Sequence, residues 1–270
     1  MTLKALITHV EPVSGPATPP HLAWALALAA GFEAHLTALI FATEVMEMAS
    51  ANAADEDPLV PERETARRIE AEAGRLGVAT SILGRSSFAY GFPEVFADHA
   101  KLSDLAVIGY GPGPTVARRM LAAGAIFSSG RPVLLVPPGP DPAGPPRRVA
   151  VAWNASPASV RAVHGVLPLI LRAEEAVVIS VTDDAEFRPG QSGAELAHLL
   201  ARHGAKASFR PVRKGGQRIL DVLMDAAAAE RADMVAMGSL AHSPLHKLVF
   251  GSATDGLLGG RARLPVLAAA

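Results

Sequence analysis

The stretch of residues 233–252 has the residue types best suited to bind an anion. Residues 234–237 form an apolar run typical of a buried parallel strand, and Gly238 ends it. A loop of small and polar residues follows, and a helix is expected to begin near Gly251-Ser252. A helix start leaves backbone N–H groups unpaired, and small side chains let a phosphate approach them. The stretch therefore predicts a phosphate-binding cradle after a parallel strand.

This loop resembles the nucleotide loop of the universal stress protein family. It reads Gly238-x2-Ala241-x9-Gly251-Ser252. Nucleotide-binding members of that family carry G-x2-G-x9-G-[S/T] between their fourth strand and fourth helix, so Ala241 stands in place of a glycine. If the backbone needs a positive φ there, alanine costs about 1 kcal/mol. Pro265-Val266, fourteen residues after Gly251, fits the family's closing strand.

The resemblance implies an adenine-nucleotide site at three strand ends in the second half of the chain. In ATP-binding members, an aspartate at the end of the first strand holds the ribose or adenine side. A valine at the end of the second strand meets adenine through its backbone. The loop after the fourth strand wraps the ribose and the phosphates. Carried over by position, the site residues are Ala152, Trp153, Asn154, Val181, Met237, Gly238, Ala241, Gly251, Ser252, Ala253 and Thr254. The implied cofactor is ATP or another adenine nucleotide, with or without Mg²⁺.

Two of these residues depart from the family pattern and leave alternatives open. Asn154 stands where the family usually has an aspartate, and it has one acceptor oxygen where a carboxylate has two. It either holds the ligand or serves as a turn residue ahead of Pro157. Trp153 is bulkier than the usual residue, and it either stacks on a base or fills the cleft.

No catalytic motif stands out in the sequence. The patterns G-x-S-x-G, G-x4-G-K-[ST] and H-E-x-x-H are all missing. His242 and His246 flank Pro244 in a loop, so the spacing of metal ligands on a helix does not apply to them. We therefore predict no catalytic residue, no metal site and at most slow ATP hydrolysis.

The composition bounds the class of protein. Of 270 residues, 50% are hydrophobic and 19% are charged, which is ample material for a core. The net charge of −1 gives no electrostatic reason to expect nucleic acid or an anionic membrane as partner. The chain has no cysteine, which excludes disulfides and zinc–thiolate sites. The beginning of the sequence lacks a signal-peptide layout, and no apolar run reads as a membrane span, so a cytoplasmic protein is expected.

The same unit occurs twice along the chain. Residues 104–109 match residues 233–238, and residues 131–136 match residues 264–267. A proline-rich stretch that cannot continue a helix or a sheet separates the two copies. We predict a first universal stress protein domain at residues 1–137, a linker at 138–146 and a second domain at 147–270.

Strands and helices are predicted to alternate in each copy. In the first, strands are expected at 4–10, 36–42, 79–83, 105–108 and 133–136, and helices at 19–30, 61–76, 93–101 and 116–127. In the second, strands are expected at 149–153, 176–181, 207–212, 234–237 and 264–267, and helices at 157–171, 193–202, 218–230 and from about 251. This alternation predicts α/β domains with doubly wound parallel sheets.

The resemblance adds a strand order and an arrangement of the two copies. It implies five strands in the order 3-2-1-4-5, an adenine nucleotide alpha-hydrolase-like fold, with ligands at the switch point between strands one and four. It also implies that the fifth strands pair antiparallel within the chain as an internal pseudo-dimer, hiding two sheet edges. Association of two copies into a homodimer stays open.

The first copy has lost most of the nucleotide pattern. Arg118-Arg119 takes the place of the glycine–serine pair, and residues 8–11 end the first strand without an aspartate. Pro112 and Pro114 remove two N–H donors from the loop. The arginines either contact a phosphate in another geometry or form a solvated helix start. We expect a degenerate and mainly structural copy.

Three functions are weighed on this basis. The leading hypothesis is a tandem universal stress protein that binds an adenine nucleotide in its second domain and acts as a stress-response regulator or sensor. The alternative is a scaffold of the same fold that binds no nucleotide and acts through protein contacts. An enzyme such as a nucleotidyl transferase ranks last, because the H-x-G-H type of signature is missing.

Overall fold

The computed structural model describes residues 2–12, 18–41, 60–84, 92–139, 141–184, 192–239 and 253–270. Its first half contains β1 (Ala5–Val10), α1 (Pro20–Phe32), β2 (His35–Ile40), α2 (Val60–Leu76), β3 (Thr80–Gly84), α3 (Phe92–Ala100), β4 (Leu105–Gly109), α4 (Val116–Ser128) and β5 (Val133–Val136). Its second half contains β6 (Arg148–Ala152), α5 (Pro157–Ile170), β7 (Glu175–Val181), α6 (Gly193–Arg202), β8 (Ala207–Val212), α7 (Ile219–Ala229), β9 (Met234–Gly238), α8 (Ala253–Leu258) and β10 (Val266–Ala269).

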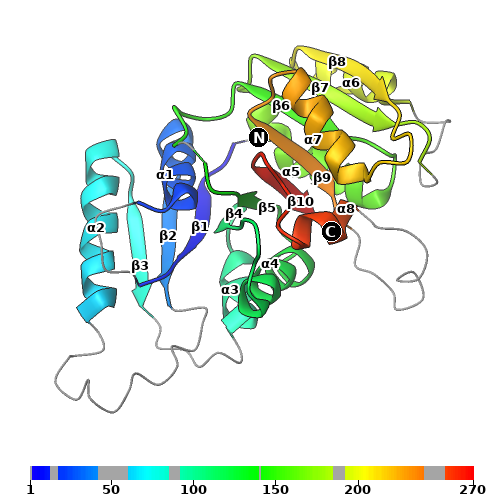
Figure 1. Ribbon diagram of the computed structural model, residues 1–270. Coiled ribbons are helices and arrows are strands. Elements are labelled where there is room, and N and C mark those ends of the chain that lie inside the picture. The colour runs from blue at the N-terminus through cyan, green and yellow to red at the C-terminus, as the bar shows by residue number, and fades with distance from the viewer. Residues whose placement is uncertain are drawn as a thin grey trace.

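The described strands form one continuous sheet in the order β3-β2-β1-β4-β5-β10-β9-β6-β7-β8 (Figure 1). Neighbouring strands run parallel within each half. β5 and β10 run antiparallel, with Leu267 opposite Leu134. The predicted doubly wound halves and the predicted pairing of the fifth strands are both confirmed.

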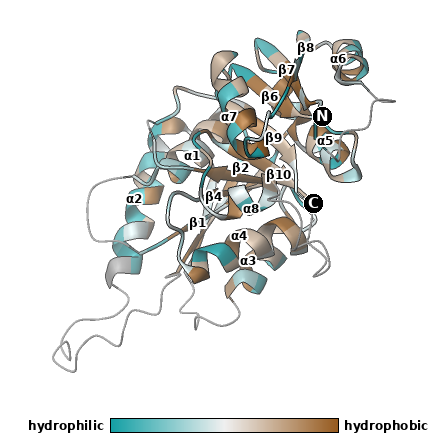
Figure 2. Ribbon diagram, turned by 45° about the vertical axis from the view of Figure 1, so that its right-hand side comes forward, coloured by the Kyte–Doolittle hydropathy of each residue, from teal (hydrophilic) through white to brown (hydrophobic). Residues whose placement is uncertain are grey.

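The central strands are apolar on both faces because helices cover both faces. Every residue of β5 and β10 is buried, and the hydropathy colouring shows the apolar strands within a shell of mixed helices (Figure 2). One apolar cluster contains residues of α1, α2, α5 and α6. The other contains residues of α3, α4, α7 and α8. Each cluster draws on both halves of the chain.

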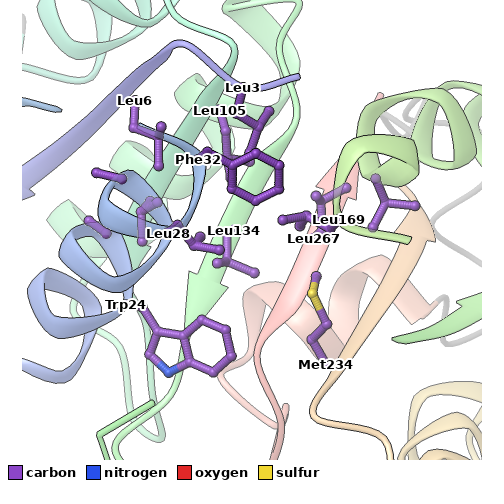
Figure 3. Close-up of a cluster of buried hydrophobic side chains, with 14 of the residues drawn as sticks. Leu3, Leu6, Trp24, Leu28, Phe32, Leu105, Leu134, Leu169, Met234 and Leu267 are labelled. Atoms are coloured by element: carbon purple, nitrogen blue, oxygen red, sulfur yellow. The ribbon is translucent and has the colours of Figure 1, made fainter. Parts of the chain in front are cut away.

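The junction between the halves is a packed core (Figure 3). Leu134 and Leu267 face each other there among large side chains from both halves, namely Leu3, Leu6, Trp24, Leu28, Phe32, Leu105, Leu169 and Met234. The guanidinium of Arg172 lies 4.2 Å from the centre of the Phe32 ring across the same junction. The boundaries predicted for two separate domains stay a prediction, because a shared sheet and core mark no division.

Helix caps follow the sequence signals. The side chains of Thr115, Ser156 and Ser192 each accept a hydrogen bond from the backbone three residues later, at the starts of α4, α5 and α6. In the part of the chain that the structure describes, no helix is both long and apolar enough to span a bilayer.

Leu267→Ala should lower the free energy of unfolding by about 2–5 kcal/mol, because Leu267 is fully buried at the junction. Leu102→Ala is the matched control, since Leu102 is 87% exposed, and it should change stability by no more than about 0.5 kcal/mol. Urea unfolding followed by circular dichroism measures both values. Equal losses in the two variants would contradict the shared core.

Candidate functional site

The topological switch point of the second half lies between β6 and β9. These strands are parallel neighbours, with Val151 opposite Ala236. The helix after β6, α5, packs in one apolar cluster, whereas the helix after β9, α8, packs in the other on the opposite face. The two connections therefore leave the sheet in opposite directions, which opens a crevice beyond the carboxyl ends of the strands.

The structure brings several predicted site residues to this edge of the sheet. Ala152, Trp153 and Asn154 end β6, and Met237 and Gly238 end β9. Val181 ends the adjacent strand β7, and Ala253 and the buried Thr254 begin α8. Ala241, Gly251 and Ser252 lie outside the described residues. The part of the loop predicted to hold the phosphates therefore stays a prediction.

Asn154 takes the turn role that its sequence context allows. Its Oδ1 accepts a hydrogen bond from Ser156 N at 3.2 Å, and Ala155 adopts a positive φ of 60° between them. Ser156 Oγ in turn accepts from Ser159 N at 3.2 Å and caps α5. This turn sets the direction in which the chain leaves β6, while a contact of Asn154 with a ligand stays a prediction.

Trp153 continues the sheet and packs inward. Its backbone N–H donates to Ile179 O at 2.8 Å. Its side chain is half-buried against the apolar cluster that contains α5 and α6. This packing favours the alternative in which the indole fills space beside the crevice over stacking on a base.

A glycine at the end of the fourth strand is a packing requirement in both halves. A Cβ on Gly238 would lie 2.4 Å from Ser159 N and 2.5 Å from the carbonyl carbon of Ala158. A Cβ on Gly109, the matching residue of β4, would lie 2.4 Å from His21 Nδ1. The first helix of each half thus begins directly against the end of the fourth strand, and no side chain fits between them.

Ser239 is a residue that sequence reasoning missed. Its N–H donates to Ala269 O at 2.7 Å, and its Oγ is enclosed without a hydrogen-bond partner among the described residues. A buried hydroxyl usually has a partner, so an unpaired one next to a crevice fits a polar ligand. Its place directly after Gly238 is the signal that could have singled it out.

The acidic pair after β7 holds a loop. Asp183 accepts hydrogen bonds from Lys214 N at 2.7 Å and from Gly215 N at 3.2 Å, and the bond from Lys214 is the main cause that lowers the pKa of Asp183. Asp184 pairs with Lys214 Nζ at 3.0 Å. Within the described ranges, no cluster of three histidine or acidic side chains could hold a metal ion.

The comparisons with known proteins agree with this geometry. The sequence model of the Universal stress protein family matches residues 146–269. The second half of the chain is therefore similar to the universal stress protein family over residues 146–269. A comparison with curated proteins finds no match.

Solved structures share the fold over nearly the whole chain. A universal stress protein from Archaeoglobus fulgidus DSM 4304 is 15% identical with a TM-score of 0.66, and the match covers 99% of this chain and 96% of that one. A functionally unknown protein from Pseudomonas aeruginosa PAO1 is also 15% identical, with a TM-score of 0.60 and coverage of 99% and 92%. At this identity the likeness concerns the fold, and it extends the universal stress protein architecture to the first half.

The first half has a cavity of about 380 Å³ at its own switch point, beyond β1 and β4. Arg118 Nη2 lies 2.9 Å from Glu11 Oε1, an ion pair on residues that line this cavity. Arg118 was expected either to contact a phosphate or to belong to a solvated helix start. It forms an ion pair with Glu11. Tyr110, also in the wall, donates through its hydroxyl to Leu258 O at 2.5 Å, which links this crevice to the end of α8.

His21 lines this first crevice and is hydrogen-bonded to the buried His9. His21 Nε2 donates to His9 O at 2.7 Å, and His9 Nε2 donates to Phe41 O at 2.8 Å. The His9 ring stacks on Phe41 with centroids 4.4 Å apart. Burial is the main cause that lowers the pKa of His9 to about 3 and the pKa of His21 to about 4. Both rings are therefore neutral near pH 7.

The free energy of unfolding should fall between pH 7 and pH 5. An unfolded histidine binds its proton near pH 6.5, whereas folded His9 and His21 do so only near pH 3 and pH 4. Below pH 6.5 the unfolded state binds more protons, which destabilises the fold by up to about 1.4 kcal/mol per pH unit for each histidine. Urea unfolding at pH 7, 6 and 5 measures this slope.

His9→Gln should reduce that slope, because glutamine does not titrate and its amide can still donate to Phe41 O. His203→Gln makes the same change on the exposed surface after α6 and is the control for the substitution itself. A slope that is the same in His9→Gln and in the unaltered protein would contradict the assignment.

Proposed function

We propose that the second half binds ATP or another adenine nucleotide in the crevice between β6 and β9, and that the protein acts as a stress-response regulator or sensor. One observation carries the proposal: β6 and β9 are neighbours whose following helices lie on opposite faces of the sheet. Ligands of doubly wound sheets bind at such a point. The match of residues 146–269 to the universal stress protein family supports the same location.

Each part of the proposed site would contact a different part of the nucleotide. Backbone amides of the loop before α8, around Gly251-Ser252, would bind the phosphates, because a helix start presents unpaired N–H groups. Val181 would meet the adenine, and Asn154 would face the ribose side. Ser239 Oγ, which is enclosed and unpaired among the described residues, would gain a hydrogen-bond partner from the ligand. The close packing of Gly238 on α5 fixes where this loop leaves the sheet.

The bound nucleotide would supply a phosphate chain that is hydrolysed slowly at most. Across the described residues no carboxylate cluster is available for a metal ion, so any Mg²⁺ would arrive on the phosphates. A cytoplasmic location and a homodimer stay predictions.

A second candidate is a scaffold that binds proteins through the same architecture. Trp153 packs against the core beside the crevice, and Asn154 Oδ1 already accepts from Ser156 N. Both contacts leave fewer groups at the end of β6 free to bind a nucleotide base. A crevice occupied by side chains under saturating nucleotide would favour this candidate.

Gly251→Asp should weaken ATP binding at least tenfold, about 1.4 kcal/mol, because it places a carboxylate in the proposed phosphate cradle. Gly74→Asp is the matched control, since it adds the same charge at an exposed position of α2 where a Cβ meets no atom within 4 Å. Isothermal titration calorimetry with ATP measures both affinities.

No heat of binding with ATP, together with no nucleotide released from the denatured protein, would overturn nucleotide binding. Equal ATP affinities of Gly251→Asp and Gly74→Asp would show that the phosphates do not bind at the loop around Gly251.

A further inference from the structure

A second cavity lies at the junction of the two halves, next to the first crevice, with which it shares Pro138 in its wall. It measures about 570 Å³ and lies beneath the segment 137–147, against α1 and the residues that precede β9 and β10. Its walls include Trp24, Pro138, Pro145, Ala232, Leu264 and Pro265. This edge holds the amino ends of β9 and β10, opposite the edge of the nucleotide crevice. A cavity of this size at a junction of structural units is typical of a small-molecule site.

The charged groups around this cavity are largely engaged with one another. Asp233 Oδ2 accepts a hydrogen bond from Arg147 N at 2.7 Å. The guanidinium of Arg147 pairs with Glu174 at 2.5 Å, and that of Arg263 pairs with Asp225 at 2.6 Å. Proline, leucine and tryptophan side chains make up most of the remaining wall. An uncharged, apolar occupant is favoured, because most of the remaining wall is apolar and the further carboxylate described there, that of Asp141, is exposed to solvent.

Trp24 brings an indole N–H to the residues that line this cavity. Its side chain is only 7% exposed, it lines the cavity, and its indole lies at the edge of the junction cluster (Figure 3). Among the described residues Nε1 has no hydrogen-bond partner, and it is not one of the fully enclosed polar atoms. A buried indole N–H usually finds an acceptor. An occupant of the cavity that Trp24 lines would be able to supply that acceptor.

In the second half, the residue at the position equivalent to Trp24 has a hydrogen-bond acceptor. Trp24 is the fifth residue of α1, and Arg161 is the fifth residue of α5. Arg161 lines a cavity of about 330 Å³ beside Asp104, and Asp104 caps the backbone there as Asp233 does here. Arg161 Nε donates to Ala270 O. The donor of the mirrored helix thus has a carbonyl acceptor, whereas Trp24 has none among the described residues.

We propose that the junction cavity binds a flat, uncharged aromatic molecule that carries a carbonyl oxygen. The carbonyl oxygen accepts the hydrogen bond of Trp24 Nε1, as Ala270 O does for Arg161. The ring system lies against the pyrrolidine rings of Pro138 and Pro145 and the aliphatic side chain of Leu264. The occupant contacts both halves and the segment between them, and its site is independent of the nucleotide proposal.

The naphthalene ketone Prodan tests this site, because it is flat, uncharged, carries one carbonyl and emits at shorter wavelength in apolar surroundings. Titration of the full chain should give saturable, one-to-one binding with a blue shift. Trp24→Phe keeps a ring but removes the N–H, and it should weaken binding about threefold to tenfold, the worth of one hydrogen bond between neutral groups. Leu264→Trp should abolish binding by filling the cavity.

Trp153→Phe is the matched control, since it makes the same change at the other tryptophan of the chain and should leave Prodan affinity within twofold. 2-Acetylnaphthalene should displace Prodan at lower concentration than 2-ethylnaphthalene, which has no acceptor. Circular dichroism verifies that each variant is folded. If Trp24→Phe does not fold, the Prodan affinity of Leu264→Trp tests the proposal. Absence of saturable binding, Prodan affinity unchanged by Leu264→Trp, or loss of binding only in Trp153→Phe would overturn the proposal.

Discussion

The antiparallel pairing of β5 with β10 is the interaction on which the rest of the structure depends. It joins two five-stranded units into one sheet and leaves neither fifth strand as an open edge. Each unit alone would expose a row of unpaired backbone groups and the apolar side chains around Leu134 and Leu267. With the pairing, α1 and α5 share one apolar cluster, and α4 and α8 share the other. The two crevices are therefore held at fixed places on one rigid body.

Within this frame the two switch points have diverged in what fills them. Both keep a glycine at the end of the fourth strand, because the first helix packs against it. In the first half His21 and the ion pair between Arg118 and Glu11 line the crevice. In the second half the strand ends carry an unpaired serine hydroxyl and lead into the small-residue loop. The first crevice thus keeps a cavity of about 380 Å³ beside these side chains, whereas the second is proposed to bind a nucleotide.

The architecture could be predicted because it rests on local patterns. The repeat of residues 104–109 in residues 233–238 placed both fourth strands, and alternating apolar runs placed the helices. One helix end shows the limit. Gly31 was expected to end α1, yet α1 continues to Phe32, and Glu33 caps it with a φ of 52°. Gly31 is needed elsewhere, since a Cβ on it would lie 2.4 Å from Pro145 Cγ.

Contacts between residues far apart in the chain were beyond the sequence. The pairing of Arg118 with Glu11, the bond from Tyr110 to Leu258 and the place of Trp24 beneath the segment 137–147 depend on tertiary packing. Asn154 could be narrowed only to two roles, and the geometry shows its turn role. The phosphate-binding residues rest on the family spacing alone, because Ala241, Gly251 and Ser252 lie outside the described residues.

Hydrogen exchange of the full chain with and without saturating ATP tests the central claim most directly. If the loop after β9 cradles the phosphates, backbone amides between residues 239 and 254 exchange more slowly with ATP, while those of residues 110–115 in the first crevice keep their rates. Unchanged exchange between residues 239 and 254 at saturating ATP, or protection confined to the first half, would contradict the account.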